Sequence, residues 1–354
     1  MSDSTVKPYL ISLPKAELHL HLEGSVSPET LAELSLRHPE MPPWENNRYH
    51  PSPESALPLS VAECRALYQY KDFTGFLMAF KAVSERLRDA EDYERITYEL
   101  MRSLHAQGVV HAEVFVSAGI VLWRGQEFAP LFAGLERGRV RGEKEFGLSL
   151  YWIFDAVRHF GAGECEKVLD LALELREQGG ASIQGIGIGG DERLAPPELF
   201  TEVYARARAA GLHLSAHAGE TTGPESIAGA LDALHAERLG HVLSAERDAR
   251  LMQRLTGEQI PLELCPSSNL RTGVCASFAD HPLRRYFDAG ALVTLNSDDP
   301  AMFGCSVAGE YQVAQEHFGF SDAEARQLAV NSILASWLPQ ERKRELLNSF
   351  PDAE

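Results

Sequence analysis

The sequence has few cationic residues and no long apolar run, and both absences narrow the possible functions. Lys and Arg number 33 against 51 Asp and Glu, which gives a formal net charge of −18. Because nucleic acids and anionic membrane surfaces would repel such a chain, we expect it to bind neither. No stretch approaches the ~18 uncharged apolar residues of a membrane-spanning helix, and the N-terminal MSDSTVKPYL lacks the apolar run of a signal peptide. The sequence therefore predicts a soluble, cytoplasmic protein.

Cysteine is scarce, and several motifs of common enzyme classes are missing. The five cysteines are an odd number spread widely along the chain, which is not the pattern of a disulfide framework. The sequence contains neither the G-x-S-x-G of serine hydrolases nor the P-C-x-x-C of the cytidine-deaminase type of zinc site. A G-x-G-x-x-G match begins at Gly185, but it lies inside an apolar run and no helix follows directly. Dinucleotide binding is therefore not favoured.

Short apolar runs recur along the chain, with amphipathic segments between them. After the first run they begin roughly 25 to 40 residues apart, which is the spacing of strand–helix units. Eight strands separated by helices predict a (β/α)8 barrel of the α/β class, with an open doubly wound sheet as the alternative. Amphipathic helices are predicted, for example, at Ala90–Gln107, Glu164–Glu177 and Pro196–Ala210. The eight runs are Ala16–Glu23, Val109–Ser117, Leu148–Asp155, Ile183–Glu192, Leu212–Glu220, Arg238–Leu243, Pro261–Asn269 and Leu292–Asp299.

The chain has no low-complexity segment or long linker that would divide it, so we predict one domain over residues 1–354. Residues 28–107 separate the first two runs and contain extra helical segments and a proline-rich loop, His38–Pro58. We expect this insertion to lie beside the mouth of the barrel and to form a lid or a wall of the substrate site. Residues Ser306–Ser349, after the eighth run, are also predicted to be helical.

Polar residues with metal-binding chemistry lie within or just after several runs. His19 and His21 are two residues apart, so on a strand both rings would face the same side and bind one metal. His217 lies near the end of the fifth run, and Glu220 follows it on what should be a loop. A carboxyl group in a partly desolvated pocket stays protonated and acts as an acid. Each of these residues also has an ordinary structural interpretation, such as a buried histidine with its hydrogen bonds satisfied or a helix cap.

Three further polar residues extend this pattern. His241 lies near the end of the sixth run, and Asp298 and Asp299 end the eighth. Two adjacent acids often cap a following helix, but an acid at the C-terminal end of a barrel strand is typical of catalysis. Histidine nitrogens and a carboxylate suit Zn²⁺, with one position left for a water that becomes a nucleophile. The residues by themselves therefore predict metal-assisted hydrolysis.

Five motifs, in order, resemble those of the adenosine deaminase family of the amidohydrolase superfamily. They are LPKAELHLHLEGS at 13–25, SAHAGE at 215–220, RLGH at 238–241, LCPSSN at 264–269 and LNSDDP at 295–300, and GGDE at 189–192 looks like the Gly-Asp-Glu segment of that family. The resemblance covers nearly the whole chain. It implies a barrel that carries one Zn²⁺ per chain, with four ligands: His19, His21, His217 and Asp298.

The same resemblance implies catalytic and substrate-binding roles. Glu220 would protonate N1 of a purine ring while hydroxide attacks C6, and His241 would orient the attacking water. Asp298 would also accept the proton of that water. The substrate contacts would be made by His21, by Glu23 at the 5′ hydroxyl of the sugar, by the backbone N–H of Gly190 at N3 and by Asp299 at N7.

The motifs leave the exact substrate open between an unmodified purine nucleoside, a nucleoside extended at its 5′ end and free adenine. Adenosine deaminases usually have Asp where this chain has Glu23, and Glu at that place also occurs in adenine deaminases. Adenine deaminases, however, lack the Gly-Asp-Glu segment and usually have Asp at the position of Gly240. These features favour a purine nucleoside, adenosine or 2′-deoxyadenosine, with 6-aminodeoxyfutalosine and adenine as alternatives. Another metal-dependent hydrolysis and an inactive binding protein are weaker hypotheses, and the sequence predicts no oligomeric state.

Overall fold

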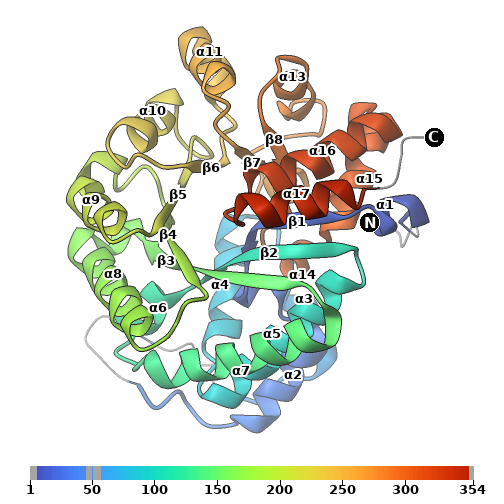
Figure 1. The fold of residues 1–354 in the computed structure, drawn as a ribbon. Helices are drawn as coiled ribbons and strands as arrows, with labels where there is room; N and C mark the ends of the chain where they lie inside the picture. The colour runs from blue at the N-terminus through green and yellow to red at the C-terminus, as the bar shows by residue number, and fades with distance from the viewer. Residues whose placement is uncertain (1–5, 45–49, 51–56, 351–354) are drawn as a thin grey trace.

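Eight parallel strands pair in chain order and form a barrel surrounded by helices (Figure 1). The computed structural model describes all residues except 1–5, 45–49, 51–56 and 351–354. An isolated bridge joins Leu20 to Asp298, and the backbone N–H of His21 donates to the carbonyl oxygen of Asp298 at 2.8 Å, which closes the ring between the first and last strands. The strands are β1 (Lys15–His21), β2 (Val109–Val116), β3 (Ser149–Val157), β4 (Ile183–Gly189), β5 (His213–Ala218), β6 (Arg238–His241), β7 (Leu262–Leu264) and β8 (Val293–Leu295).

This arrangement confirms the predicted (β/α)8 barrel and shows that the open doubly wound sheet is wrong. The helices around the barrel are α5 (Ala90–His105), α6 (Ala118–Trp123), α7 (Ala129–Phe146), α8 (Ala162–Glu177), α9 (Thr201–Ala209), α10 (Pro224–Asp232), α11 (Ala249–Gly257), α12 (Pro266–Arg271), α13 (Leu283–Asp288), α14 (Pro300–Phe303), α15 (Val307–Phe318), α16 (Asp322–Ala335) and α17 (Gln340–Asn348). Short 3₁₀ helices lie at Glu23–Ser25, Arg158–Phe160, Pro197–Phe200 and Ala245–Arg247. None of the helices in the described ranges is long and apolar enough to cross a membrane.

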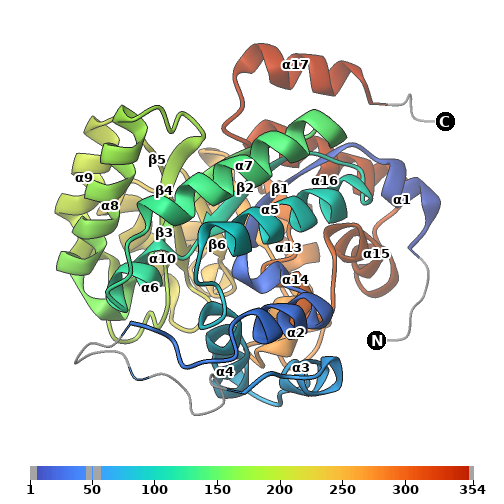
Figure 2. The ribbon, with the colours of Figure 1, turned by 90° about the horizontal axis from the view of Figure 1, so that it is seen from below.

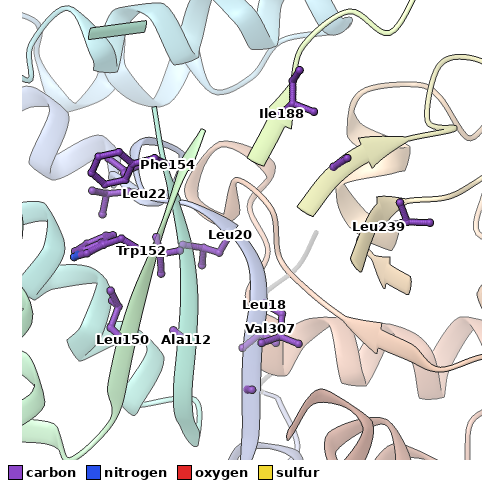
Figure 3. Close-up of a cluster of buried hydrophobic side chains, with 14 of the residues drawn as sticks. Leu18, Leu20, Leu22, Ala112, Leu150, Trp152, Phe154, Ile188, Leu239 and Val307 are labelled. Atoms are coloured by element: carbon purple, nitrogen blue, oxygen red, sulfur yellow. The ribbon is translucent and has the colours of Figure 1, made fainter. Parts of the chain in front are cut away.

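The hydrophobic core lies between the strands and the helices that cover them. Leu18 and Leu20 on β1 and Trp152 and Phe154 on β3 belong to it (Figure 3). The ring of Phe154 lies 5.2 Å from that of Phe128, next to α7. Burying such a side chain contributes about 1.5–3 kcal/mol. Because side chains alternate along a strand, the residues between these apolar ones face the barrel interior.

Five α-helices precede the second strand in the described residues. α1 (Pro8–Ser12) lies before β1, and α2 (Pro28–Arg37), α3 (Val61–Leu67), α4 (Phe73–Ser84) and α5 follow β1. Helices α2, α3 and α4 lie together at one end of the molecule, and α17 lies at the other (Figure 2). Of the proline-rich loop predicted at His38–Pro58, residues 45–49 and 51–56 lie outside the described residues.

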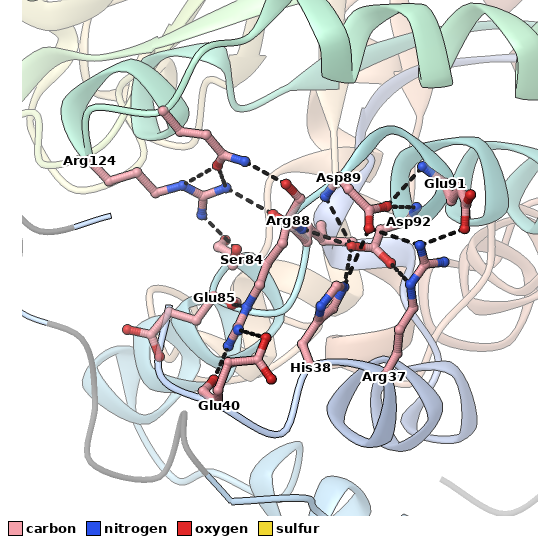
Figure 4. Close-up of polar contacts among 12 residues, drawn as sticks. Arg37, His38, Glu40, Ser84, Glu85, Arg88, Asp89, Glu91, Asp92 and Arg124 are labelled. Atoms are coloured by element: carbon pink, nitrogen blue, oxygen red, sulfur yellow. Dashed lines mark hydrogen bonds and ion pairs between the residues drawn. The ribbon is translucent and has the colours of Figure 1, made fainter. Parts of the chain in front are cut away.

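A polar cluster attaches α2 to the start of α5 (Figure 4). The buried carboxylate of Asp92 accepts hydrogen bonds from the backbone N–H groups of Arg88 and Asp89, at 2.9 and 3.1 Å. The same carboxylate lies 2.7 Å from Nε2 of His38 and 3.4 Å from Nε of Arg37. These contacts position α2 relative to α5, which is one of the helices around the barrel.

Most of the predicted runs end a few residues earlier in the structure, and two of these differences affect the site. The seventh run was predicted to continue to Asn269, but β7 ends at Leu264 and α12 begins at Pro266. Proline is favoured in the first turn of a helix, because its missing N–H would have no partner there. Likewise β1 ends at His21, so Glu23 lies on a 3₁₀ helix and not on an extended strand.

Candidate active site

Four side chains converge at the C-terminal ends of the strands. His19 and His21 come from β1, His217 comes from β5, and Asp298 follows β8. Nε2 of His21 lies 3.3 Å from Nε2 of His217 and 3.5 Å from Oδ1 of Asp298. Nε2 of His19 lies 3.7 Å from the same Oδ1. The structure thus brings together all four residues that the sequence suggested as metal ligands.

The chemistry of this cluster fits a metal ion. Burial and the neighbouring histidines hold the pKa values of His19 and His217 well below the usual range, so both rings are neutral and offer lone pairs. Nε2 of His19 is buried and has no hydrogen-bond partner among the described residues. Three neutral imidazoles and one carboxylate are a donor set that Zn²⁺ binds.

The outer atoms of these ligands are held by hydrogen bonds. Nδ1 of His19 lies 2.8 Å from a carboxylate oxygen of Glu263, and Nδ1 of His217 lies 3.1 Å from the carbonyl oxygen of Ile188. The hydroxyl of Ser268 donates to Oδ2 of Asp298 at 2.6 Å. Such contacts fix the tautomer and orientation of metal ligands. Asp298 also has a φ of 61°, a strained left-handed conformation that is typical of functional positions.

Glu220 lies on the loop after β5, where a second carboxylate shapes the backbone. Glu192 accepts hydrogen bonds from the N–H groups of Gly219, Glu220 and Thr221, at 2.7, 2.8 and 3.1 Å. Burial raises the pKa of Glu220. A carboxyl group that keeps its proton in a cavity has the properties of a general acid.

His241 is the last residue of β6 and lies near both Glu220 and Asp298, one of the four converging side chains. Its Nε2 is 3.8 Å from Oε2 of Glu220 and 3.9 Å from Oδ2 of Asp298. Burial lowers the pKa of His241, but these two carboxyl groups outweigh it and raise that pKa above its usual range. Its other nitrogen, Nδ1, lies 3.1 Å from Nδ2 of Asn269, and His241 has a φ of 66°. The ring is therefore held in one orientation.

Of the remaining residues that were predicted to contact the substrate, some line the cavity and one does not. Gly190 and Asp299 line the same cavity as the cluster, as do His21 and Glu220. Gly190 has a φ of 92°, and a Cβ there would lie 2.8 Å from Nδ1 of His159, so glycine is required. Glu23 is buried and does not line the cavity in the described structure; its Oε1 accepts a hydrogen bond from the N–H of Ser117 at 3.0 Å.

The cavity has a volume of about 330 Å³ and extends from the cluster to an apolar wall. Phe73, Phe76, Leu77 and Phe80 form this wall from α4, and Trp123 joins it from α6. The indole of Trp123 stacks on Phe160, with ring centroids 4.1 Å apart. The sequence predicted that the insertion at 28–107 would form a lid or a substrate wall, but it did not identify these residues, because an aromatic stripe at helical spacing is typical of any core-facing helix.

Sequence reasoning also missed Asp155, which lies on β3 and lines the cavity. Its Oδ1 is buried and has no hydrogen-bond partner in the part of the chain that the structure describes. Burial, with Glu23 nearby, raises the pKa of Asp155 well above its usual range. The available signal was an acidic residue in an apolar run, one residue from Phe154 and therefore on the opposite, inward face.

Comparisons with known proteins agree with this geometry. A family model described as adenosine deaminase matches residues 14–353. An adenine deaminase of Ectopseudomonas mendocina is 38% identical over 92% of this chain and 98% of its own length. An aminodeoxyfutalosine deaminase of Streptomyces avermitilis is 36% identical over 93% of this chain and 88% of its own.

Solved structures show the same relationship. The crystal structure of an amidohydrolase from Burkholderia ambifaria with bound Zn is similar with a TM-score of 0.84 and 27% identity, over 96% of this chain and 90% of that one. The residues that match the family model, 14–353, include the eight strands and all four converging side chains. The chain therefore belongs to the adenosine deaminase family of hydrolytic deaminases.

Proposed function

We propose that this chain hydrolyses the C6–N bond of a 6-aminopurine nucleoside, such as adenosine or 2′-deoxyadenosine, and releases ammonia. The observation that carries the proposal is that Glu220 and Asp298 both approach Nε2 of His241, at 3.8 and 3.9 Å, and that all three residues line the cavity. An acid and a base thus face one point where a reacting carbon and a water can meet. The deaminases among the relatives support a 6-aminopurine as substrate.

We propose one zinc ion per chain, held by His19, His21, His217 and Asp298. The zinc-bound relative and the neutral, oriented imidazoles support this assignment. Such an ion, when bound, supplies Lewis acidity that activates a water as the nucleophile.

In this proposal the protein side chains move the protons of the reaction. Asp298 accepts the proton of the attacking water, and His241 orients that water towards C6. Glu220 donates its proton to N1, which makes C6 more electrophilic and stabilises the tetrahedral intermediate. A C6–O bond forms, and the amino group takes up the proton that Asp298 accepted from the water. The C6–N bond then breaks, ammonia leaves, and the proton of the C6 hydroxyl returns to Glu220 as the C6=O bond forms. The N–H of Gly190 would contact N3, and Asp299 would hydrogen-bond N7.

The structure also suggests where the sugar meets the protein. Glu23 lies behind the cavity wall, where its carboxylate accepts a hydrogen bond from the N–H of Ser117. Ser117 itself lines the cavity. We therefore expect Glu23 to shape the sugar side of the pocket through Ser117, and not to bind the 5′ hydroxyl directly as its place in the motif had suggested.

Position 240 supports a nucleoside over free adenine, although an adenine deaminase is 38% identical. A Cβ at Gly240 would lie 2.5 Å from Cε1 of His19. The aspartate that the resemblance associates with adenine deaminases at this place would thus require the ring of His19 to move.

A second candidate is a nucleoside extended at its 5′ end, such as aminodeoxyfutalosine. The observation that favours it is the apolar wall of α4 and α6, which lies beyond the groups that would hold the purine. Such a wall buries an apolar substituent that neither adenine nor adenosine carries. The aminodeoxyfutalosine deaminase among the relatives supports the same candidate.

An ultraviolet assay of zinc-loaded protein with adenosine, 2′-deoxyadenosine, adenine and aminodeoxyfutalosine tests both candidates. We expect kcat/KM for at least one nucleoside to exceed that for adenine. Adenine as the best substrate would overturn the nucleoside proposal, and a preference for aminodeoxyfutalosine over adenosine would select the second candidate.

A further inference from the structure

Three charged side chains cross the barrel interior beside the proposed metal ligands. Glu113 on β2, Arg238 on β6 and Glu263 on β7 are each at most 1% exposed. Nε of Arg238 lies 2.6 Å from Oε1 of Glu263, and Nη1 of Arg238 donates to Oε2 of Glu113. The second oxygen of Glu263 lies 2.8 Å from Nδ1 of His19. One guanidinium therefore lies between two buried carboxylates, and one of these holds a ligand of the metal.

The far end of this network is anchored by the segment between α16 and α17. The backbone N–H of Trp337 donates to Oε1 of Glu113 at 2.5 Å, and Nε2 of His111 lies 3.0 Å from the same oxygen. The indole ring of Trp337 lies over the guanidinium of Arg238, with 3.8 Å between Cζ and the ring centroid. The guanidinium of Arg238 is thus covered by an indole ring and paired with two carboxylates, so it has little freedom to move.

The contacts of His19 explain why this matters for the metal. A neutral imidazole carries one N–H, and donating it from Nδ1 to Glu263 leaves the lone pair on Nε2. Nε2 faces the other ligands and has no hydrogen-bond partner among the described residues. Glu263 accepts this proton well only while its carboxylate stays in place, and Arg238 is the cation that ion-pairs with it. None of Glu113, Arg238 and Glu263 lines the cavity.

We propose that Arg238 is a positioning residue for the metal centre: by holding Glu263 against Nδ1 of His19, it fixes the orientation of that ligand and raises the metal affinity of the site. The inference rests on the metal site of the proposed function. Because the network also bonds the backbone at Trp337, the segment between α16 and α17 contributes to metal affinity from outside the cavity.

The test compares Zn²⁺ affinity in the full-length wild type and in three variants. Arg238→Met removes the cation, and Arg238→Lys keeps a charge that reaches fewer oxygens. Arg124→Met is the matched control, because Arg124 is also buried but donates to the carbonyl oxygens of Ser84 and Leu87, away from His19. Metal-free protein is titrated with Zn²⁺ against a chromophoric chelator, and the absorption spectrum with Co²⁺ reports the ligand geometry.

We expect Arg238→Met to weaken Zn²⁺ binding by roughly 10- to 100-fold and to change the Co²⁺ spectrum. Arg238→Lys should recover part of the loss, and Arg124→Met should match the wild type. Wild-type affinity and spectrum in Arg238→Met, or an equal loss in Arg124→Met, would overturn the inference. Absence of Zn²⁺ binding by the wild type would instead contradict the proposed metal site itself. If Arg238→Met does not fold, Glu113→Gln decides in its place: weaker Zn²⁺ binding supports the inference, and unchanged binding overturns it.

Discussion

Buried acidic side chains occur in two regions of the barrel interior, and only one region has arginine to pair with them. Beside β2, β6 and β7, Glu113 and Glu263 flank Arg238. At the mouth, Asp155, Glu220 and Asp299 form no ion pair with Lys or Arg in the described part of the chain. Asp155 and Asp299 are buried as Glu113 and Glu263 are, and Glu220 is only slightly exposed, so the main difference lies in the partners.

This difference separates groups that hold the fold from groups that await a ligand. Burial by itself raises the pKa of Glu113, but Arg238 and His111 reverse this and lower the pKa to about 2. Glu263 shares Arg238, which lowers its pKa as well, but burial still raises that pKa to about 7. Without a cation, burial raises the pKa of Asp155 and of Asp299 well above the usual range. Buried polar groups without partners cost stability, and proteins keep them mainly where a substrate or metal completes their contacts.

Removing a ligand at the mouth should have the largest effect. We expect Asp298→Ala to lose the metal and to reduce kcat/KM to background, because three remaining ligands bind weakly and the base for the water is gone. Metal analysis and the deaminase assay measure both effects, and thermal unfolding confirms that the variant is folded. A folded variant that keeps its metal and its turnover would show that Asp298 stabilises the fold and takes no part in metal binding or catalysis.

Glu220→Gln should separate the acid from the ligands. The amide cannot protonate N1, so we expect kcat to fall by roughly 10²–10⁴ while metal content stays unchanged. Burial raises the pKa of Glu220, which keeps the active, protonated form present at higher pH; activity should therefore decline on the alkaline side as this proton is lost. Stopped turnover combined with retained metal supports the assignment, whereas near-normal kcat contradicts it.

A fourth acid without a cation allows the cost in stability to be measured. Burial raises the pKa of Glu310, on α15, from its usual value of 4.5 to about 7. The native state thus holds this proton where the unfolded chain has released it, so the stabilisation present below pH 4.5 is lost as the pH rises through about 7. Glu310→Gln should remove this loss, at most about 3 kcal/mol at 1.36 kcal/mol per pKa unit.

Urea unfolding at pH 5 and pH 8 measures this effect. We expect the free energy of unfolding of Glu310→Gln to fall less than that of the wild type between the two values. Glu113→Gln is the opposite case, because it removes an acid that is paired with Arg238, and it should destabilise the protein at both pH values. Parallel pH profiles for Glu310→Gln and the wild type would contradict the prediction.

The smallest effect concerns the apolar side of the mouth. Leu77→Ala shortens a side chain of the wall and should raise KM for a 5′-extended nucleoside roughly tenfold, with little change for adenine. Met78→Ala is the matched control, since Met78 is 50% exposed on the same helix, as Leu77 is 45% exposed, but does not line the cavity. Equal changes in the two variants would show that the wall does not bind substrate.

Much of the site followed from local sequence patterns. The two-residue spacing of His19 and His21 placed both rings on one face of β1, and the recurring apolar runs placed His217, His241 and Asp298 at strand ends that meet at one mouth. These predictions succeeded because strand periodicity is a local property and because parallel strands of a barrel all end on the same side.

Other features depended on contacts that no local pattern contains. β1 ends at His21, so Glu23 lies on a 3₁₀ helix, where its carboxylate accepts a hydrogen bond from the N–H of Ser117, 94 residues further along the chain. The cation of Arg238 meets Glu113 only because β2 and β6 face each other across a closed barrel. The apolar wall likewise exists only where α4 and α6 meet above the mouth. The sequence by itself determined which side chains share a face of each strand. Only the closed tertiary structure decided which of these faces touch, because contacts across the barrel join residues far apart in the chain.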